Sequence, residues 1–178
     1  MNLYLRLLIA LWRGWRLPSI RPGETIERTF RVWPNDIDLN GHMNNGRYLT
    51  MLDQLLIEYF IRFGFMKHVV RQGWKPMAGG SFISYRRGLQ PFQRYRVRFA
   101  TEGSNEHWNF MRFEFLDAQD RLCATGYVKG AVVGKQGLVR NAEACALMGM
   151  AQDTRVPEAV ALWLAGEQAL MNASRLPR

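Results

Sequence analysis

The chain is best interpreted outward from one stretch, Asp36-Ile37-Asp38-Leu39-Asn40-Gly41-His42-Met43-Asn44-Asn45-Gly46-Arg47-Tyr48. Two carboxylates, three asparagines and a histidine crowd these residues, immediately before an apolar segment with helical periodicity. The free N–H groups and the macrodipole at the start of a helix favour negative charge. An acyl carbonyl placed there would have its developing oxyanion stabilised by backbone donors. A carboxylate of the same stretch could activate water or attack the carbonyl itself.

The sequence on both sides of this stretch predicts an α+β layout. Residues Thr25–Trp33 alternate apolar and polar side chains in the manner of a strand. From Arg47 to Gly64 the apolar residues recur at helical spacing, which predicts a long helix buried against a sheet. The tail from Asn141 is expected to be helical, most clearly over Glu158–Met171. Four further strand-like segments are separated by turn signals: Met77–Arg87, Phe92–Thr101, Trp108–Leu116 and Leu122–Val133.

Two other interpretations of the loop have to be weighed. The pattern Asp-x-Asp-x-Asn-Gly at 36–41 matches the first half of an EF-hand calcium loop. The twelfth place carries Arg47 instead of a bidentate glutamate, so calcium binding of that kind is not expected. Alternatively, Asp36, Asn40 and Asn44 cap the helix and shape turns, and the histidine is an ordinary loop residue. One or two caps would suffice, so capping explains the whole cluster less well.

Together with Tyr48, the run Asp38-Leu39-Asn40-Gly41-His42-Met43-Asn44-Asn45 resembles the signature of hot-dog thioesterases. It is similar both to bacterial acyl-CoA thioesterases of the 4-hydroxybenzoyl-CoA type and to plant acyl-ACP thioesterases. The order of predicted elements agrees with that fold, and the resemblance covers Thr25 to Val133. It implies a curved antiparallel sheet of about five strands wrapped around one long central helix, with N- and C-terminal helical extensions.

The resemblance also implies an activity and assigns roles to residues. The expected reaction is hydrolysis of an acyl-CoA thioester to free acid and CoA, without metal or organic cofactor, in a homodimer or dimer of dimers. The apolar helix face and the N-terminal segment favour a medium or long fatty acyl chain, and an acyl-carrier protein in place of CoA stays open. Asp38 matches the base or nucleophile of the bacterial enzymes, and Asn45 the residue whose backbone N–H polarises the thioester. Asn40 and His42 complete the Asp-x-Asn-x-His arrangement implicated in the plant enzymes. The other residues expected to contact substrate are Asn44, Gly46, Tyr48, Asp53, Arg86 and Arg87.

One feature departs from the plant pattern. Those enzymes carry a further acid after a Tyr-Arg-Arg stretch, whereas Tyr85-Arg86-Arg87 is followed here by Gly88 and Leu89. The sequence therefore favours a mechanism that rests on Asp38 alone, with the motif's asparagine and histidine orienting water or substrate. Asp53 lies on an apolar helix, where it should pair with an arginine or border the neighbouring subunit's site.

The formal charge of +9 and the pI near 10.1 indicate an anionic partner. Arg94, Arg96 and Arg98 alternate with apolar residues, which sends the arginines to one sheet face and the apolar side chains to the other. Phosphates of CoA suit such arginines, although a solvated face explains them equally. No RNA-recognition, KH or zinc-finger pattern occurs, so nucleic acid is not the expected partner. A non-catalytic hot-dog protein that binds acyl thioesters or acts in a membrane-associated assembly remains the alternative.

The first residues carry a separate prediction. Residues 1–16 are too short to span a bilayer and lack the features of a signal peptide. Trp12 and Trp15 among arginines suit an interfacial helix on a membrane, while a helix packed on its own domain or dimer partner is the alternative. We expect an N-terminal amphipathic segment at 1–20, a hot-dog domain at 21–136 and a C-terminal helical extension at 137–178.

The two cysteines, Cys123 and Cys145, lie far apart and without metal-site spacing, so neither a disulfide framework nor a cysteine-based metal site is expected. This usage predicts a reducing compartment. The predicted location is the cytoplasm, with peripheral contact to the inner face of a membrane as the open alternative.

Overall fold

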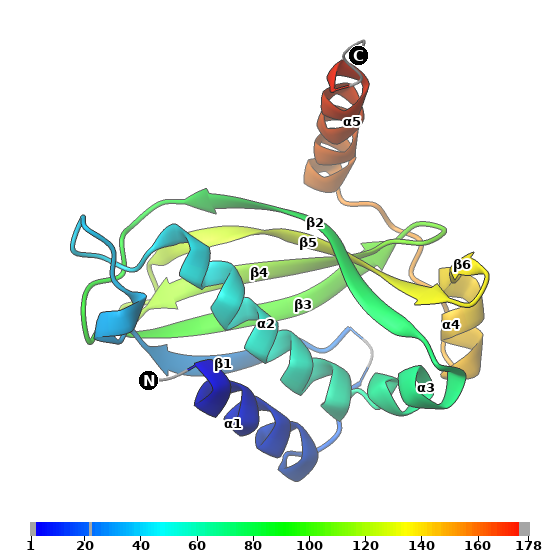
Figure 1. The fold of residues 1–178 in the computed structure, drawn as a ribbon, viewed down its shortest axis with the longest axis horizontal. Coiled ribbons are helices and arrows are strands. Elements are labelled where there is room, and N and C mark those ends of the chain that lie inside the picture. The colour runs from blue at the N-terminus through cyan, green and yellow to red at the C-terminus, as the bar shows by residue number, and fades with distance from the viewer. Residues whose placement is uncertain (1–2, 22, 175–178) are drawn as a thin grey trace.

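The structure, a computed structural model, describes residues 3–21 and 23–174. Its centre is a curved antiparallel sheet in the strand order β1-β3-β4-β5-β2, with the two-residue β6 paired to β5 (Figure 1). The strands are β1 (Ile26–Arg31), β2 (Lys75–Tyr85), β3 (Arg94–Ser104), β4 (Asn109–Asp117), β5 (Leu122–Gly134) and β6 (Gly137–Leu138). All five predicted strands are present, so the predicted α+β hot-dog architecture is confirmed.

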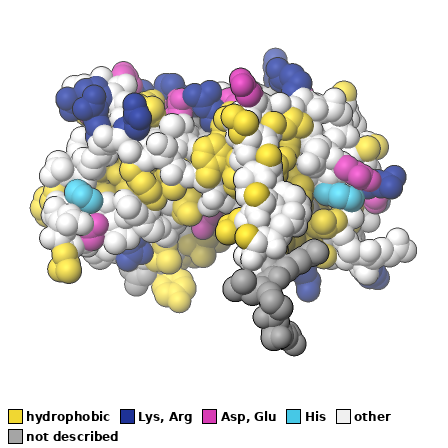
Figure 2. Space-filling view, turned by 90° about the horizontal axis from the view of Figure 1, so that it is seen from above, with side chains coloured by type: hydrophobic (Ala, Val, Ile, Leu, Met, Phe, Trp, Pro, Cys, Tyr) yellow, Lys and Arg dark blue, Asp and Glu magenta, His cyan; other side chains and the backbone are white. Residues whose placement is uncertain are grey.

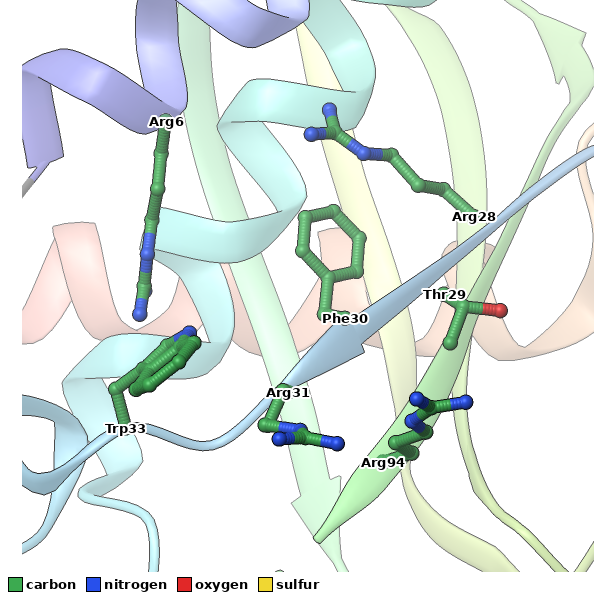
Figure 3. A pocket seen from close by; sticks show the side chains of 7 residues that line it. All are labelled: Arg6, Arg28, Thr29, Phe30, Arg31, Trp33 and Arg94. Atoms are coloured by element: carbon green, nitrogen blue, oxygen red, sulfur yellow. The ribbon is translucent and has the colours of Figure 1, made fainter. Parts of the chain in front are cut away.

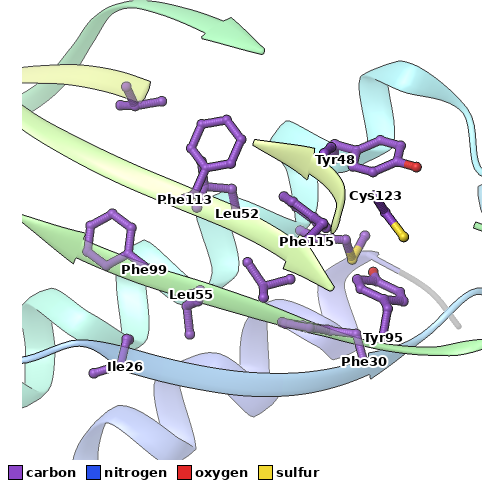
Figure 4. Packing of buried hydrophobic residues seen from close by; sticks show 14 of the residues in the cluster. Ile26, Phe30, Tyr48, Leu52, Leu55, Tyr95, Phe99, Phe113, Phe115 and Cys123 are labelled. Carbon is purple, nitrogen blue, oxygen red and sulfur yellow. The ribbon is translucent and has the colours of Figure 1, made fainter. Parts of the chain in front are cut away.

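The long helix α2 (Asn45–Arg62) lies across the concave side of the sheet. Alternation in β3 turns Tyr95, Val97 and Phe99 toward this helix, where they are buried in the main core (Figure 4). The ring of Phe99 meets Tyr59 of α2 edge-on, with centroids 4.9 Å apart. Each such side chain contributes about 1.5–3 kcal/mol through burial, so this face fixes how α2 sits on the sheet.

The opposite face of the sheet is charged, as the alternation in β3 predicts. Arg96 and Arg98 both pair with Glu27 of β1, at 2.9 and 3.1 Å. Arg112 of β4 pairs with Glu114 at 2.7 Å. These arginines already have carboxylate partners, so this part of the basic surface is a cross-strand ion-pair ladder rather than a vacant phosphate site.

Four further helices surround this unit: α1 (Leu3–Arg16), α3 (Phe65–Gln72), α4 (Asn141–Leu147) and α5 (Glu158–Ala173). Helix α1 packs on α2, where Gly14 leaves room for the side chain of Ile61. Helix α5 starts on the outer face, where Val160 is buried beside Phe110 and Tyr127, and it then projects past β2 (Figure 1). Among the described residues, none of the helices has both the length and the apolar character needed to cross a membrane.

Strands β1 and β2 form the two edges of the sheet. The outer edge of β2 is uncovered in the single chain, and Met77 and Tyr85 on it are 41% and 39% exposed. Seen from this edge, hydrophobic side chains gather along the middle of the surface, and Lys and Arg lie mainly along one margin (Figure 2). An uncovered apolar edge of this kind favours pairing with another strand.

Candidate active site

The loop between β1 and α2 is held in a compact shape by its own backbone. A short 3₁₀ turn at Pro34–Asp36 is followed by an antiparallel bridge between Ile37 and Met43. The N–H of Asp38 donates to the carbonyl of His42 at 3.0 Å, and Met43 donates to the carbonyl of Leu89 at 2.8 Å. These bonds tie the loop to the segment after β2 and fix where its side chains point.

The first aspartate of the loop has a structural role. Asp36 is buried, and both its oxygens accept from the Arg6 guanidinium of α1, at 2.9 and 2.6 Å. One oxygen also accepts from the N–H of Trp33 at 3.0 Å. A bidentate buried pair of this kind fixes α1 on the loop, and its loss would leave an uncompensated charge. The sequence-based capping interpretation of Asp36 therefore holds in part, with Arg6 as a partner that it did not foresee.

The second aspartate is open to solvent. The Asp38 side chain is 19% exposed, and its Oδ1 accepts from the backbone N–H of Asn40 at 2.9 Å. The same oxygen lies 3.7 Å from Nδ1 of His42. Asp38, Asn40 and His42 are thus brought together as the sequence predicts, although Asn40 contacts the carboxylate through its backbone.

The start of α2 lies beside this carboxylate loop. Asn44 is the N-cap, and its side-chain oxygen accepts from the N–H of Gly46 at 2.9 Å. The Tyr85 hydroxyl at the end of β2 donates to the carbonyl of Asn45 at 3.0 Å. The N–H of Asn45 belongs to the first helical turn, where N–H groups have no intrahelical acceptor. The geometry therefore leaves the Asn45 N–H as the candidate donor, while Asn44 and Gly46 are engaged with each other.

Tyr85 was not among the residues predicted to act, although it opens the quoted Tyr-Arg-Arg stretch. In place of an acid, that stretch is followed by Gly88. A Cβ at Gly88 would lie 3.1–3.2 Å from Cβ, Cγ and Cδ2 of His42. The imidazole therefore packs against bare backbone where a side chain would otherwise contact it.

Arg86 and Arg87 are exposed beside the loop, and the backbone N–H of each donates to the carbonyl of Cys123.

Burial excludes other groups near the site as bases or nucleophiles at neutral pH. Tyr48 is buried under the loop, and this desolvation raises its pKa to about 12. Burial likewise raises the pKa of the Cys123 thiol above its usual value. The thiol and the phenol therefore stay protonated at neutral pH, which leaves Asp38 as the carboxyl group of the loop that solvent can reach.

Asp53 lies on α2 two turns beyond the site, about 12 Å from Asn45 along the helix. Desolvation by its apolar surroundings raises its pKa. The predicted arginine partner is not found: among residues 3–21 and 23–174 no arginine pairs with Asp53. The structure therefore does not bring Asp53 to the Asp38 loop of its own chain.

A cavity of about 920 Å³ opens around the other end of α2. Its lining is mostly apolar and includes Leu56, Phe60, Phe63, Met77, Met111 and Met148, with Asp53 at its border. Of the described residues, none from the 36–46 loop lines it. Asn45 and Phe60 are about 22 Å apart along the helix, so the cavity and the carboxylate loop of one chain are separate. Sequence reasoning did not identify this cavity, because its lining comes from eight separate elements: α1, α2, α3, β2, β3, β4, β5 and α4.

Comparison with known proteins identifies the family. The family model of the thioesterase-like superfamily matches residues 32–164, which include the loop, α2 and the whole sheet except β1. The chain belongs to the thioesterase-like superfamily.

Relatives within this superfamily are distant. The chain is 24% identical to "Protein THEM6" of Xenopus laevis over 137 residues, covering 75% of this chain and 64% of that protein. It is also 24% identical to "Protein THEM6" of Drosophila melanogaster over 130 residues, covering 69% and 63% respectively. The chain thus spans less than two thirds of the length of these curated relatives.

Solved structures share the fold at low identity. A Staphylococcus aureus protein studied in complex with CoA superimposes with a TM-score of 0.63 at 13% identity, over 80% of this chain and 95% of that one. A DHNA-CoA thioesterase from the same organism gives a TM-score of 0.62 at 15% identity, over 86% and 97%. These matches establish the hot-dog architecture of the chain.

Proposed function

We propose that the protein hydrolyses acyl-CoA thioesters, with Asp38 as general base or nucleophile. The observation that carries this proposal is the solvent-facing carboxylate of Asp38, held by the Asn40 N–H beside the N-terminus of α2. Among solved structures of the same fold, one was studied in complex with CoA and another is a DHNA-CoA thioesterase. Family membership supports the reaction class, and the loop supplies the residues.

In the first route, Asp38 takes a proton from water, whose oxygen attacks the thioester carbon. The carbonyl oxygen becomes an oxyanion next to the Asn45 N–H, where the dipole of α2 stabilises negative charge. The intermediate collapses, the C–S bond breaks, and CoA leaves as a thiolate that takes up the proton. His42, with Nδ1 3.7 Å from Asp38, orients the carboxylate and the water.

In the second route, an oxygen of Asp38 attacks the thioester carbon and CoA leaves as a thiolate. The resulting mixed anhydride is then cleaved by water. A single turnover in heavy-oxygen water can demonstrate the second route, because only that route can label the enzyme. The first route never labels Asp38, whereas attack of water on the aspartyl carbon of the anhydride leaves heavy oxygen in the enzyme.

The acyl chain is proposed to occupy the apolar cavity of a second subunit. Pairing of two β2 edges would set two α2 helices antiparallel, which brings the Asp38 loop of one chain to the cavity of the other. Asp53 would then border the partner's site. A volume of about 920 Å³ is at the upper end of ordinary ligand pockets and suits a medium or long acyl chain. The proposed location is the cytoplasm, where the two free cysteines would remain reduced.

The reaction is tested by thiol release from acyl-CoAs of graded chain length, comparing wild type with Asp38→Asn. Asp120→Asn is the matched control, because Asp120 is an exposed aspartate in the β4–β5 turn that pairs with Arg96 and lies outside the 36–46 loop. Hydrolysis that peaks at one chain length and collapses only in Asp38→Asn supports the proposal. Full activity of Asp38→Asn would overturn the role of Asp38. Binding without thiol release by wild type would instead support the non-catalytic alternative.

The shared site is tested by mixing two inactive variants. Asp38→Asn removes the carboxylate, and Leu56→Trp fills the cavity. A mixed dimer contains one site with both an intact Asp38 and an intact cavity. Equal mixing with subunit exchange should therefore restore about a quarter of wild-type activity, as random pairing in a two-fold dimer predicts. No recovery in proven mixed dimers would place both parts of each site in one chain.

A further inference from the structure

Helix α1 buries charged side chains and exposes apolar ones, which is the reverse of an ordinary surface helix. Two of its three arginines point inward, while Arg16 at its end is exposed: Arg6 binds Asp36, and Arg13 donates to Glu58 of α2 at 2.8 Å. Ordinary surface helices bury an apolar stripe and present charges to water. Here the buried face holds ion pairs with the domain, so these two positive charges are neutralised internally.

The outward face of α1 is apolar and aromatic. Tyr4, Leu8, Trp12 and Trp15 share one helical stripe, and they are 75%, 62%, 59% and 75% exposed. The helix cannot rotate to hide them, because the Arg6–Asp36 pair and the contact of Gly14 with Ile61 fix its orientation. A continuous exposed stripe of this type marks an interaction surface.

A basic groove of about 260 Å³ lies between α1 and the edge strand β1. Figure 3 shows Arg6 extending from α1 toward Trp33, with Arg31 and Arg94 at the ends of β1 and β3. Arg31 and Arg94 are direct cross-strand partners and both are exposed. Within the described part of the chain, neither has an acidic partner, whereas Arg96 and Arg98, farther along the same face of β3, are paired with Glu27. Two like charges placed opposite each other are unfavourable unless an anion binds them.

We propose that α1 and this groove form a docking surface for an anionic phospholipid membrane. Tyrosine and tryptophan rings settle at the boundary between headgroups and acyl chains, and α1, with 14 residues, would lie in that boundary rather than cross it. Arg31 and Arg94 would contact lipid phosphates, which match the guanidinium fork. The net charge of +9 attracts the protein to an anionic surface.

A second copy of the chain fits this surface less well. Helix α1 and the groove lie on the β1 side of the sheet, whereas the uncovered edge that favours strand pairing is β2. A dimer formed through β2 would leave α1 exposed in both subunits. The high positive charge also opposes association of two identical basic surfaces.

The test is flotation of the full chain with vesicles of phosphatidylcholine alone or mixed with phosphatidylglycerol. Wild type should float with the mixed vesicles. Trp12→Ala with Trp15→Ala should lower the partition coefficient at least about tenfold, since two large apolar side chains no longer enter the boundary. The matched control is Leu162→Ala with Leu170→Ala on α5, where both leucines are also exposed; it should float like wild type.

A second pair of variants tests the groove. Arg31→Ala with Arg94→Ala should weaken binding about tenfold on the mixed vesicles only, because the arginines act on lipid charge. The control Arg71→Ala with Arg140→Ala removes the same charge elsewhere and should have a smaller effect. Equal flotation of the tryptophan variant and wild type, with thermal unfolding unchanged, would overturn the proposal. Loss of a dimer in the tryptophan variant without vesicle binding by wild type would assign the surface to a second copy.

Discussion

The two halves of the loop between β1 and α2 use the same residue type for opposite purposes. Asp36 is 1% exposed and is bound by the Arg6 guanidinium, whereas the side chain of Asp38, two residues later, is 19% exposed and accepts a backbone N–H. A buried, paired carboxylate holds structure but is unavailable to a substrate. A solvent-facing carboxylate with one weak donor contributes little stability but can take a proton or attack a carbonyl. Burial and partner therefore decide the role of each aspartate.

The largest expected effect comes from removing the buried ion pair between Asp36 and Arg6. Asp36→Asn leaves Arg6 charged and unpaired in the interior, so we expect the free energy of unfolding to fall by about 3–5 kcal/mol. Urea denaturation followed by circular dichroism measures this change.

The control replaces both partners at once, Arg6→Met with Asp36→Leu. Removing both charges abolishes the desolvation cost along with the attraction, so much of the lost stability should return. A double variant as unstable as Asp36→Asn would show that the pair is needed for more than charge balance.

Substitution of the partly exposed Asp38 gives the next largest effect, which falls on activity and not on stability. Asp38→Asn should lower kcat/KM by at least about 10²-fold, because the base or nucleophile is gone. Its free energy of unfolding should stay within about 0.5 kcal/mol of wild type, because the side chain is partly exposed and asparagine can still accept the N–H of Asn40. Thiol release and urea denaturation of the same preparation check both parts. A large loss of stability would mean that Asp38 also stabilises the fold, so that the division into a structural Asp36 and a catalytic Asp38 would be wrong.

The sequence was sufficient to predict the loop, the central helix and the five main strands, because these follow from periodicity and turn residues in neighbouring positions. Strand β3, for example, was predicted at Phe92–Thr101 and is found at Arg94–Ser104. The different fates of Asp36 and Asp38 could not be predicted. They depend on Arg6, thirty residues away, and no local sequence pattern links that arginine to the loop. The missing arginine partner of Asp53 and the cavity have the same cause, since both depend on contacts between distant elements.

A smaller effect is expected where the loop joins α2. Asn44→Ala removes the bond to the Gly46 N–H, and loss of an N-cap costs about 1 kcal/mol. Asn44→Asp should retain most of the stability, because a carboxylate caps equally well and is favoured by the helix dipole. Urea denaturation of the three proteins provides the measurement. Equal stability of Asn44→Ala and wild type would indicate that Asn44 serves the substrate instead of the helix.

The smallest effect concerns Asp53, a third carboxylate that has neither an arginine like Asp36 nor a backbone donor like Asp38 among the described residues. Desolvation raises its folded-state pKa above the unfolded value of about 3.9. The folded protein therefore favours the protonated form of Asp53 more than the unfolded chain does. The resulting stability is fully present below the unfolded pKa and is lost as pH rises through the folded pKa.

Asp53→Asn mimics the protonated form at every pH. Wild type and variant should therefore be equally stable in acid, and the variant should become the more stable one as pH rises toward neutrality. The difference should stay below about 0.5 kcal/mol in a single subunit, because the side chain is largely exposed there. Thermal unfolding across this pH range measures it. A wild type that gains stability relative to the variant as pH rises would reveal a cationic partner for Asp53, which in the proposed dimer would have to come from the second subunit.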